Sequence, residues 1–137
     1  AEYCSFSGKL VEVHALDESA GARFSEIFSR SRFEEAFPSA QELPLLVGLD
    51  FEWKPDRAPG DNHPIALMQL ACWDSCLIIR TTGCSQLPPW LTAFLEDTKF
   101  AKVTASFDLS DKEKLRTSFG WVFDERATAC SFLDIAE

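Results

Sequence analysis

The stretch VGLDFEW, residues 47–53, carries two carboxylates two residues apart in an otherwise apolar run. In a strand, residues i and i+2 point to the same face, so Asp50 and Glu52 are predicted to lie side by side. Two like charges repel, and burying them unpaired is costly enough to force one of them to take up a proton. A divalent cation between them removes this conflict. Their apolar neighbours are predicted to face the opposite layer of the fold: Leu49, Phe51 and Trp53.

A simpler interpretation of Asp50 and Glu52 stays open. The two acids can lie at the exposed end of the strand and form ion pairs with Lys54, Arg57 or a neighbouring helix terminus. The surrounding sequence favours a functional site, because the pair ends an apolar strand and is followed by a loop rich in Pro, Gly and Asp. The next predicted strand contains Gln69.

The composition indicates one globular domain that spans residues 1–137. Of these 137 residues 46% are hydrophobic, which is enough to close a core. A net charge of −9 argues against a broad electrostatic grip on nucleic acid, because phosphate binding normally uses clustered Lys and Arg. Divalent cations can, however, turn a cluster of carboxylates into a phosphate-binding site, so acidity does not exclude nucleic-acid chemistry.

The cysteines and the hydropathy indicate where the protein works. Five cysteines form an odd set without paired short spacings, which excludes a complete disulfide framework and favours a reducing compartment. No apolar run approaches the roughly 18 to 20 residues of a membrane span, and the N-terminus lacks the order of a signal peptide. We therefore expect a soluble, intracellular protein of the nucleus or cytoplasm, with no membrane partner.

Strand-like and helix-like patterns alternate along the chain. Predicted strands cover residues 9–16, 45–53, 65–72, 76–80 and 100–105, and residues 129–135 form a last strand or the start of a helix. Predicted helices cover residues 19–32, with Ser19 as N-cap, a segment that starts at Pro88 and Pro89, and residues 109–119, closed by Gly120. Residues 65–80 form an antiparallel hairpin. This order predicts an α/β fold with a mixed sheet of antiparallel and parallel strands flanked by helices.

A third acidic position is available in SFDLSDKEKL, residues 106–115, which supplies Asp108 and Asp111. Asp111 and Leu115 are four residues apart and share a helix face, so Leu115 can anchor the helix while Asp111 faces the strand edge. The alternative is an ordinary solvated helix start, since the helix dipole favours acids in a first turn.

These segments resemble the DEDD superfamily of 3′-to-5′ exonucleases, in the branch that contains ribonuclease D, the Werner-syndrome exonuclease domain and the Mut-7 or Nibbler proteins. VGLDFEW followed by HPIALMQLACWDSCLII is similar to the first motif of that branch, and SDKEKL is similar to its second. The resemblance covers residue 47 to the end of the chain and implies a ribonuclease-H-like fold. The sequence before the second motif departs from the usual glycine-rich pattern, so the choice between Asp108 and Asp111 stays open.

The C-terminal part departs further from the family. The third motif of this branch is a Tyr four residues before a final Asp, and the only tyrosine here is Tyr3. SFLDIAE resembles the segment before that motif, so Asp134 is expected to be a structural acid. Either the chain is a truncated part of a longer domain, incomplete at its C-terminus, or the motif has been lost. Truncation is the favoured interpretation, because the sequence stops in mid-pattern.

The resemblance implies a two-metal mechanism with Mg²⁺ or Mn²⁺. Asp50 would bridge the two ions, and Glu52 and Asp111 would each bind one of them. Nearby residues would line the substrate site, although core packing explains each of them equally well: Phe51, Trp53 and Gln69. Lys54 and Arg57 would contact the nucleic-acid backbone or simply be solvated.

Three functions follow from these observations. The first is a 3′-to-5′ exonuclease that hydrolyses phosphodiester bonds from the 3′ end of single-stranded RNA or DNA. The second is a catalytically inactive exonuclease-like module that binds protein or RNA, and the third is an unrelated α/β domain. No short motif distinguishes RNA from DNA. Further protein partners are expected to bind through the rest of a longer chain.

Overall fold

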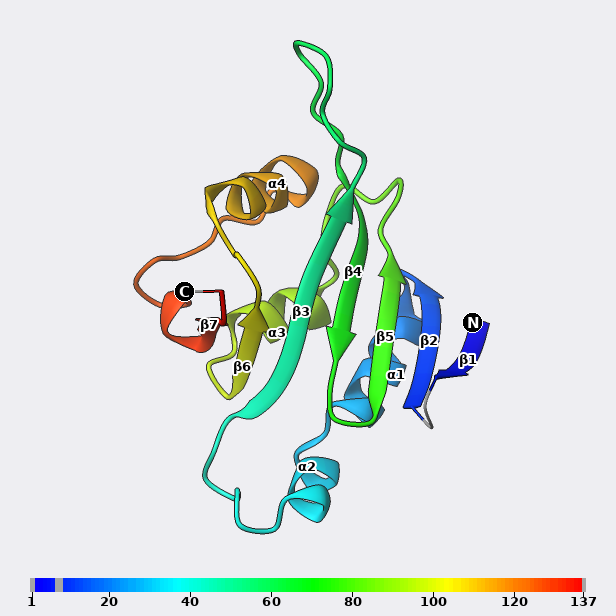
Figure 1. Ribbon diagram of the computed structural model, residues 1–137, viewed down its shortest axis with the longest axis vertical. Helices are drawn as coiled ribbons and strands as arrows, with labels where there is room; N and C mark the ends of the chain where they lie inside the picture. The colour runs from blue at the N-terminus through cyan, green and yellow to red at the C-terminus, as the bar shows by residue number, and fades with distance from the viewer. Residues whose placement is uncertain (1, 7–8, 137) are drawn as a thin grey trace.

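The computed structural model describes residues 2–6 and 9–136, which form a seven-stranded sheet with helices (Figure 1). The strands are β1 (Glu2–Phe6), β2 (Lys9–Ala15), β3 (Leu45–Trp53), β4 (Ile65–Ala71), β5 (Ser75–Arg80), β6 (Phe100–Thr104) and β7 (Phe132–Asp134). The helices are α1 (Glu18–Ile27), α2 (Arg30–Ala36), α3 (Pro89–Glu96), α4 (Leu109–Phe119) and the short 3₁₀ helix η1 (Ala129–Ser131).

The sheet is mixed, as the sequence predicts. Its strand order is β1-β2-β5-β4-β3-β6-β7. Strand β4 pairs antiparallel with β3 and β5, and β1 pairs antiparallel with β2. The pairs β2–β5, β3–β6 and β6–β7 are parallel. The predicted antiparallel hairpin is therefore confirmed, and residues 129–135 contribute both the 3₁₀ helix and the edge strand β7.

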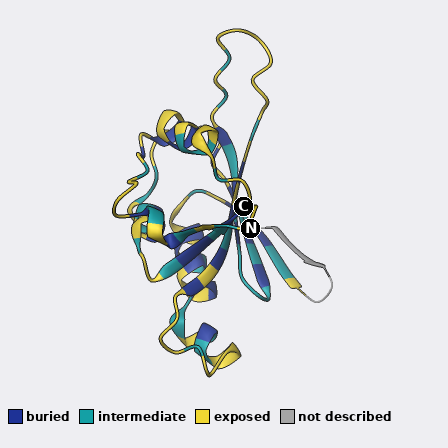
Figure 2. Cartoon of the chain, turned by 60° about the vertical axis from the view of Figure 1, so that its left-hand side comes forward, coloured by how far each residue is buried: buried dark blue, intermediate teal, exposed yellow. Residues whose placement is uncertain are grey.

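One face of the sheet holds the hydrophobic core. In β3 the buried residues alternate with more exposed ones along the strand, and the buried set is Leu45, Val47, Leu49 and Phe51. Helices α1, α3 and α4 lie on this side of the sheet (Figures 1 and 2). Their buried apolar side chains include Phe24, Leu91, Phe94 and Leu115. Burial of these side chains stabilises the fold mainly through the hydrophobic effect.

The other face of the sheet is uncovered by the described helices, as Figure 2 shows. Three large apolar side chains there are well exposed: Leu46 at 52%, Leu133 at 45% and Ile135 at 72%. Alternation in β3 places Asp50 and Glu52 on the same face as Leu46.

The helical region after β2 corrects two predictions. The cap of α1 is Asp17, whose carboxylate accepts a hydrogen bond from Ala20 N at 3.1 Å, whereas Ser19 only donates its hydroxyl to Asp17. The single helix predicted over residues 19–32 is two helices. Ser29 caps the second helix, because its hydroxyl oxygen accepts a hydrogen bond from Arg32 N. This side-chain bond takes the place of a backbone bond that would continue the first helix, which ends at Ile27.

No helix in the described part of the chain has both the length and the apolar character needed to cross a membrane. The cysteines that the structure describes in full are free thiols: Cys72, Cys76, Cys84 and Cys130.

Candidate active site

Asp50 and Glu52 lie on the open face of β3, and both side chains are exposed. The predicted same-face geometry is therefore present. The two carboxylates are not buried, however, because they face solvent while Leu49 and Phe51 face the core. The conflict expected from burying two like charges therefore does not arise. Neither acid takes part in an ion pair with any described residue, so pairing with Lys54 or Arg57 does not account for them.

The third acid comes from the start of α4, where a capping box fixes two aspartates. Asp108 is the N-cap, and its carboxylate accepts from Ser110 N at 2.8 Å and from Asp111 N at 3.2 Å. In return, Asp111 Oδ2 accepts from Asp108 N at 3.0 Å. Leu115, one turn later, is fully buried and holds this helix against the core, as the sequence predicts.

The electrostatics of these two acids differ. Hydrogen bonds, led by that from Asp111 N, hold the pKa of Asp108 below its usual value. Burial raises the pKa of Asp111, and the negative charges of Asp108 and Asp50 raise it further. Asp111 therefore lies within electrostatic reach of Asp50, although the two residues come from a helix and a strand 61 positions apart. Asp108 is occupied as a helix cap.

The described carboxylates fit a cation by charge, but they do not converge into a complete set of ligands. Asp50 and Asp111 repel each other, and a cation would relieve this repulsion. Among residues 2–6 and 9–136, however, no group of three or more His, Cys, Asp or Glu side chains lies close enough to hold a metal ion. Asp50 and Glu52 thus share one face of β3, and Asp111 lies within electrostatic reach of Asp50, but the three carboxylates do not form a closed coordination site.

A shallow hollow lies on the open face beside Asp50. Its lining comes from the central strands and the end of the chain: Gly48, Leu49, Asp50, Gln69, Ala71, Cys76, Val103, Thr104, Ala105 and Ile135. Gln69 lies directly opposite Asp50 in the register of β3 and β4. The amide of Gln69 is therefore placed beside the first carboxylate, where it can donate a hydrogen bond.

The two predicted aromatic contacts are arranged differently. Phe51 is 6% exposed and lies in the core, with its ring centroid 6.4 Å from that of Phe107, so core packing describes its position. Trp53 is half-buried and follows a register shift between Glu52 and Trp53. The ring of Trp53 lies 5.6 Å from the ammonium of Lys114. This buried lysine is a residue that the sequence patterns did not reveal.

Asp134 has the structural role expected for it. Its carboxylate accepts hydrogen bonds from the backbone N–H groups of Ser106, Phe107 and Ala136, at 2.8 to 3.0 Å. These bonds lower the pKa of Asp134. They also hold the turn between β6 and α4, in which Ser106 has a positive φ of 61°. Asp134 thus supports the segment that leads into Asp108 and Asp111.

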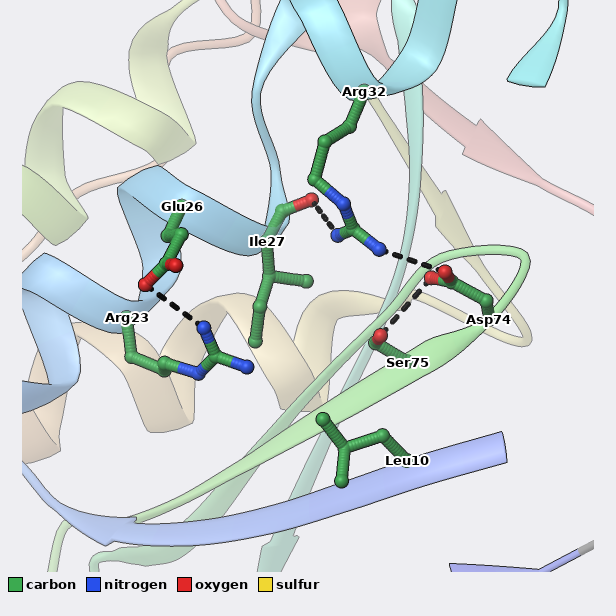
Figure 3. A pocket seen from close by; sticks show the side chains of 7 residues that line it. All are labelled: Leu10, Arg23, Glu26, Ile27, Arg32, Asp74 and Ser75. Carbon is green, nitrogen blue, oxygen red and sulfur yellow. Dashed lines mark hydrogen bonds and ion pairs between the residues drawn. The ribbon is translucent and has the colours of Figure 1, made fainter. Parts of the chain in front are cut away.

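A second polar hollow lies on the helix-covered side of the sheet (Figure 3). It contains the guanidinium groups of Arg23 and Arg32, but both are already paired. Arg23 contacts Glu26 at 2.9 Å and the fully buried Glu12 at 2.7 Å, and Arg32 contacts Asp74 at 2.7 Å. Because these cations are neutralised by neighbouring carboxylates, the hollow lacks the free positive charge that a phosphate needs.

The fold is similar to that of solved exonuclease domains. The EXD2 exonuclease domain soaked in Mn and GMP matches with a TM-score of 0.58 and 24% identity, over 91% of this chain and 55% of that chain. The Nibbler EXO domain of Aedes aegypti matches with a TM-score of 0.58 and 22% identity, over 90% of this chain and 52% of that one. The chain has the fold of these exonuclease domains. The predicted ribonuclease-H-like sheet is therefore confirmed.

The chain spans a little over half the length of the EXD2 and Nibbler domains that it matches. The EXD2 domain was also soaked in Mg and GMP, with the same TM-score of 0.58. No family model and no curated protein matches the chain.

Proposed function

We propose that the chain is part of a 3′-to-5′ exonuclease of the DEDD superfamily, which removes nucleotides from the 3′ end of single-stranded RNA or DNA. The observation that carries this proposal is the shared open face of Asp50 and Glu52 on β3, together with Asp111 at the capped start of α4, near enough for the charge of Asp50 to raise its pKa. This arrangement unites acids that the sequence motifs singled out separately. The fold shared with exonuclease domains, one of them soaked in Mn and GMP, supports the proposal.

The proposed ligands of two Mg²⁺ or Mn²⁺ ions are Asp50, Glu52 and Asp111. Such ions lower the pKa of a bound water and stabilise the leaving oxygen of a phosphodiester. The chain itself positions the carboxylates. The pleat of β3 presents Asp50 and Glu52 to solvent, and the capping box holds Asp111 at the start of α4. Gln69, opposite Asp50, would orient a ligand or the substrate through its amide.

We further propose that a segment outside this sequence completes the site. The resemblance implies a Tyr and a fourth carboxylate on a later helix, and the described residues do not gather a complete set of metal ligands. An amphipathic helix would also cover the exposed apolar side chains of Leu46, Leu133 and Ile135. The greater length of the solved exonuclease domains is consistent with such a segment.

A second candidate is a non-catalytic module that binds protein or RNA. It is favoured by one observation, namely that no described group of three or more potential ligands can hold a metal ion. In that case Asp50 and Glu52 would be exposed acids of a retained fold, with no role in hydrolysis.

The test uses the complete protein and 5′-labelled single-stranded RNA and DNA in the presence of Mn²⁺. The proposal predicts stepwise shortening from the 3′ end. It also predicts that Asp50→Asn, Glu52→Gln and Asp111→Asn abolish the shortening, because each removes a metal-ligand charge. Glu35→Gln, at an exposed acid on α2, is the matched control and should keep full activity. Shortening that survives the three substitutions would refute the assignment, and no shortening by the wild-type protein would favour the non-catalytic module.

A further inference from the structure

Lys114 is a buried lysine on α4 whose ammonium is fully occupied. Its side chain is only 7% exposed. The Nζ atom donates hydrogen bonds to Asp56 Oδ2 at 2.8 Å, to Asn62 Oδ1 at 3.0 Å and to His63 O at 2.6 Å. An ammonium has three donors, so each of them has an acceptor. Such complete pairing is what allows a charge to be buried without a large penalty.

All three acceptors belong to the loop of residues 54–64, which connects β3 to β4 and projects from the end of the sheet (Figure 1). The loop is also closed at its base, because Asp56 Oδ1 accepts from His63 N at 2.8 Å. Together with the bond from Lys114, this contact lowers the pKa of Asp56. Lys114 therefore joins both arms of the loop to one helix.

Ser118 forms a second tie, one turn after Lys114 on the same helix face. Its hydroxyl oxygen accepts from Ile65 N, at the first residue of β4, at 2.9 Å. Leu115, between the two, is fully buried. Helix α4 is thus fixed to the loop and to the start of β4 by two polar contacts and one apolar anchor.

This attachment bears on the candidate site, because the joined elements carry its acids. Asp111 lies three residues before Lys114 on α4, and the clamped loop begins directly after β3, which carries Asp50 and Glu52. The ammonium of Lys114 also lies over the ring of Trp53, the last residue of β3. A shift of α4 relative to β3 would therefore break the contacts of Lys114 and move Asp111 relative to Asp50.

We propose that Lys114 is a positioning residue, which sets the place of Asp111 relative to Asp50 and Glu52 by clamping α4 to the β3–β4 loop. This inference rests on the proposed function, since it concerns the same three carboxylates. Without the ammonium, the acceptors on Asp56, Asn62 and His63 lose their shared donor and the loop separates from the helix. Helix α4 then keeps only the contact of Ser118 and the buried Leu115, so Asp111 is held less firmly relative to β3.

The experiment compares Mn²⁺ binding by the complete protein, its Lys114→Met variant and its Lys112→Met variant, measured by calorimetric titration. Lys112 is the matched control. It lies on another side of α4, where it pairs with Glu125 at 2.8 Å and lies 4.5 Å from the ring of Phe123. Both substitutions remove one positive charge near the site, which by charge alone strengthens cation binding.

The sign of the change separates the two effects. Positioning predicts that Lys114→Met weakens Mn²⁺ binding roughly tenfold or more, the range found when residues that support metal ligands are lost. Lys112→Met is expected to bind Mn²⁺ as well as the wild type or slightly better. Ser118→Ala, which removes only the second tie, should weaken binding less than Lys114→Met. Unchanged or tighter binding by a folded Lys114→Met protein overturns the inference.

Hydrogen exchange provides a readout that does not depend on metal. In Lys114→Met, amide exchange is expected to become faster in the loop at residues 54–64 and also in residues 109–113, around Asp111. Unchanged exchange at residues 109–113 overturns the inference, whatever the Mn²⁺ titration shows. A wild-type protein that binds no Mn²⁺ would refute the proposed function, while the exchange data would still decide whether Lys114 positions Asp111.

Discussion

Replacement of Lys102 by methionine should change how the stability of the protein depends on pH. Lys102 lies on β6 and is fully buried. Its ammonium lies 5.8 Å from the ring of Phe94 and 5.3 Å from that of Phe132, and donates a hydrogen bond to Asp97 O at 2.8 Å. Burial lowers the pKa of Lys102 from 10.5 to about 8, because the charged form loses its hydration.

The sign of the effect follows from proton linkage. Between pH 8 and 10.5 the unfolded chain keeps the proton on Lys102 while the folded protein has released it, so the free energy of unfolding rises with pH. Below pH 8 both states are protonated, and the folded protein bears the full cost of a buried charge. A shift of this size corresponds to about 3 kcal/mol in total, or about 1.4 kcal/mol per pH unit inside the window.

The assay is urea unfolding, followed by tryptophan fluorescence, of the wild type and Lys102→Met between pH 7 and 10. Other groups that titrate are common to both proteins and cancel in the difference. The wild type should gain stability relative to the variant as pH rises above 8. Lys99→Met, which removes an exposed lysine from the turn before β6, controls for the loss of a positive charge. A difference between wild type and Lys102→Met that stays constant, or that changes in the opposite direction, would show that burial does not lower the pKa of Lys102.

Two further substitutions test local features of the fold. Asp108→Ala should lower the melting temperature because α4 loses its N-cap. Asp108→Asn should keep most of the stability and leave Mn²⁺ binding intact. Impaired Mn²⁺ binding by Asp108→Asn would mean that Asp108 is itself a ligand. Gly21→Ala should destabilise the protein by about 1–2 kcal/mol in urea unfolding despite the better helix propensity of alanine, since the new Cβ would lie 2.7 Å from the buried Nε1 atom of the half-buried Trp90. A more stable variant would contradict this packing.

The parts of the fold that follow from local periodicity could be predicted from the sequence. The two-residue repeat of β3 placed Asp50 and Glu52 on one face, and the four-residue spacing of α4 placed Leu115 in the core. The two-residue repeat does not show which face of the sheet is covered, because this depends on where helices that are distant in the sequence pack. The repeat alone therefore cannot tell whether the carboxylates are buried, and the structure shows them exposed.

Contacts between segments that are distant in the sequence could not be predicted from local sequence patterns. Lys114 resembled any solvated lysine of a helix rich in charge, and only the tertiary structure brings it to Asp56, Asn62 and His63. Helix caps were predicted incompletely for a similar reason. Asp17 and Ser19 are both good capping residues, and backbone geometry rather than residue type decides which of them accepts from the first turn.

The capping box at the start of α4 contains both aspartates that the sequence offers as a third ligand. Both Asp108 and Asp111 were candidates for the third ligand, and the sequence could not separate them. The reciprocal hydrogen bonds engage both carboxylates at the helix terminus, and the negative charge of Asp50 helps to raise the pKa of Asp111. The assignment of Asp111 as a metal ligand remains part of the proposed function.

The most direct test of the proposed metal site is a crystal structure of the complete protein soaked in Mn²⁺, with the anomalous signal of manganese used to locate the ion. If the proposed site is right, a manganese peak lies in contact with the carboxylates of Asp50 and Asp111, with Glu52 turned towards it. The proposal would be contradicted by an ordered site in which these three carboxylates hold no manganese, or by manganese bound only at other acids of the chain.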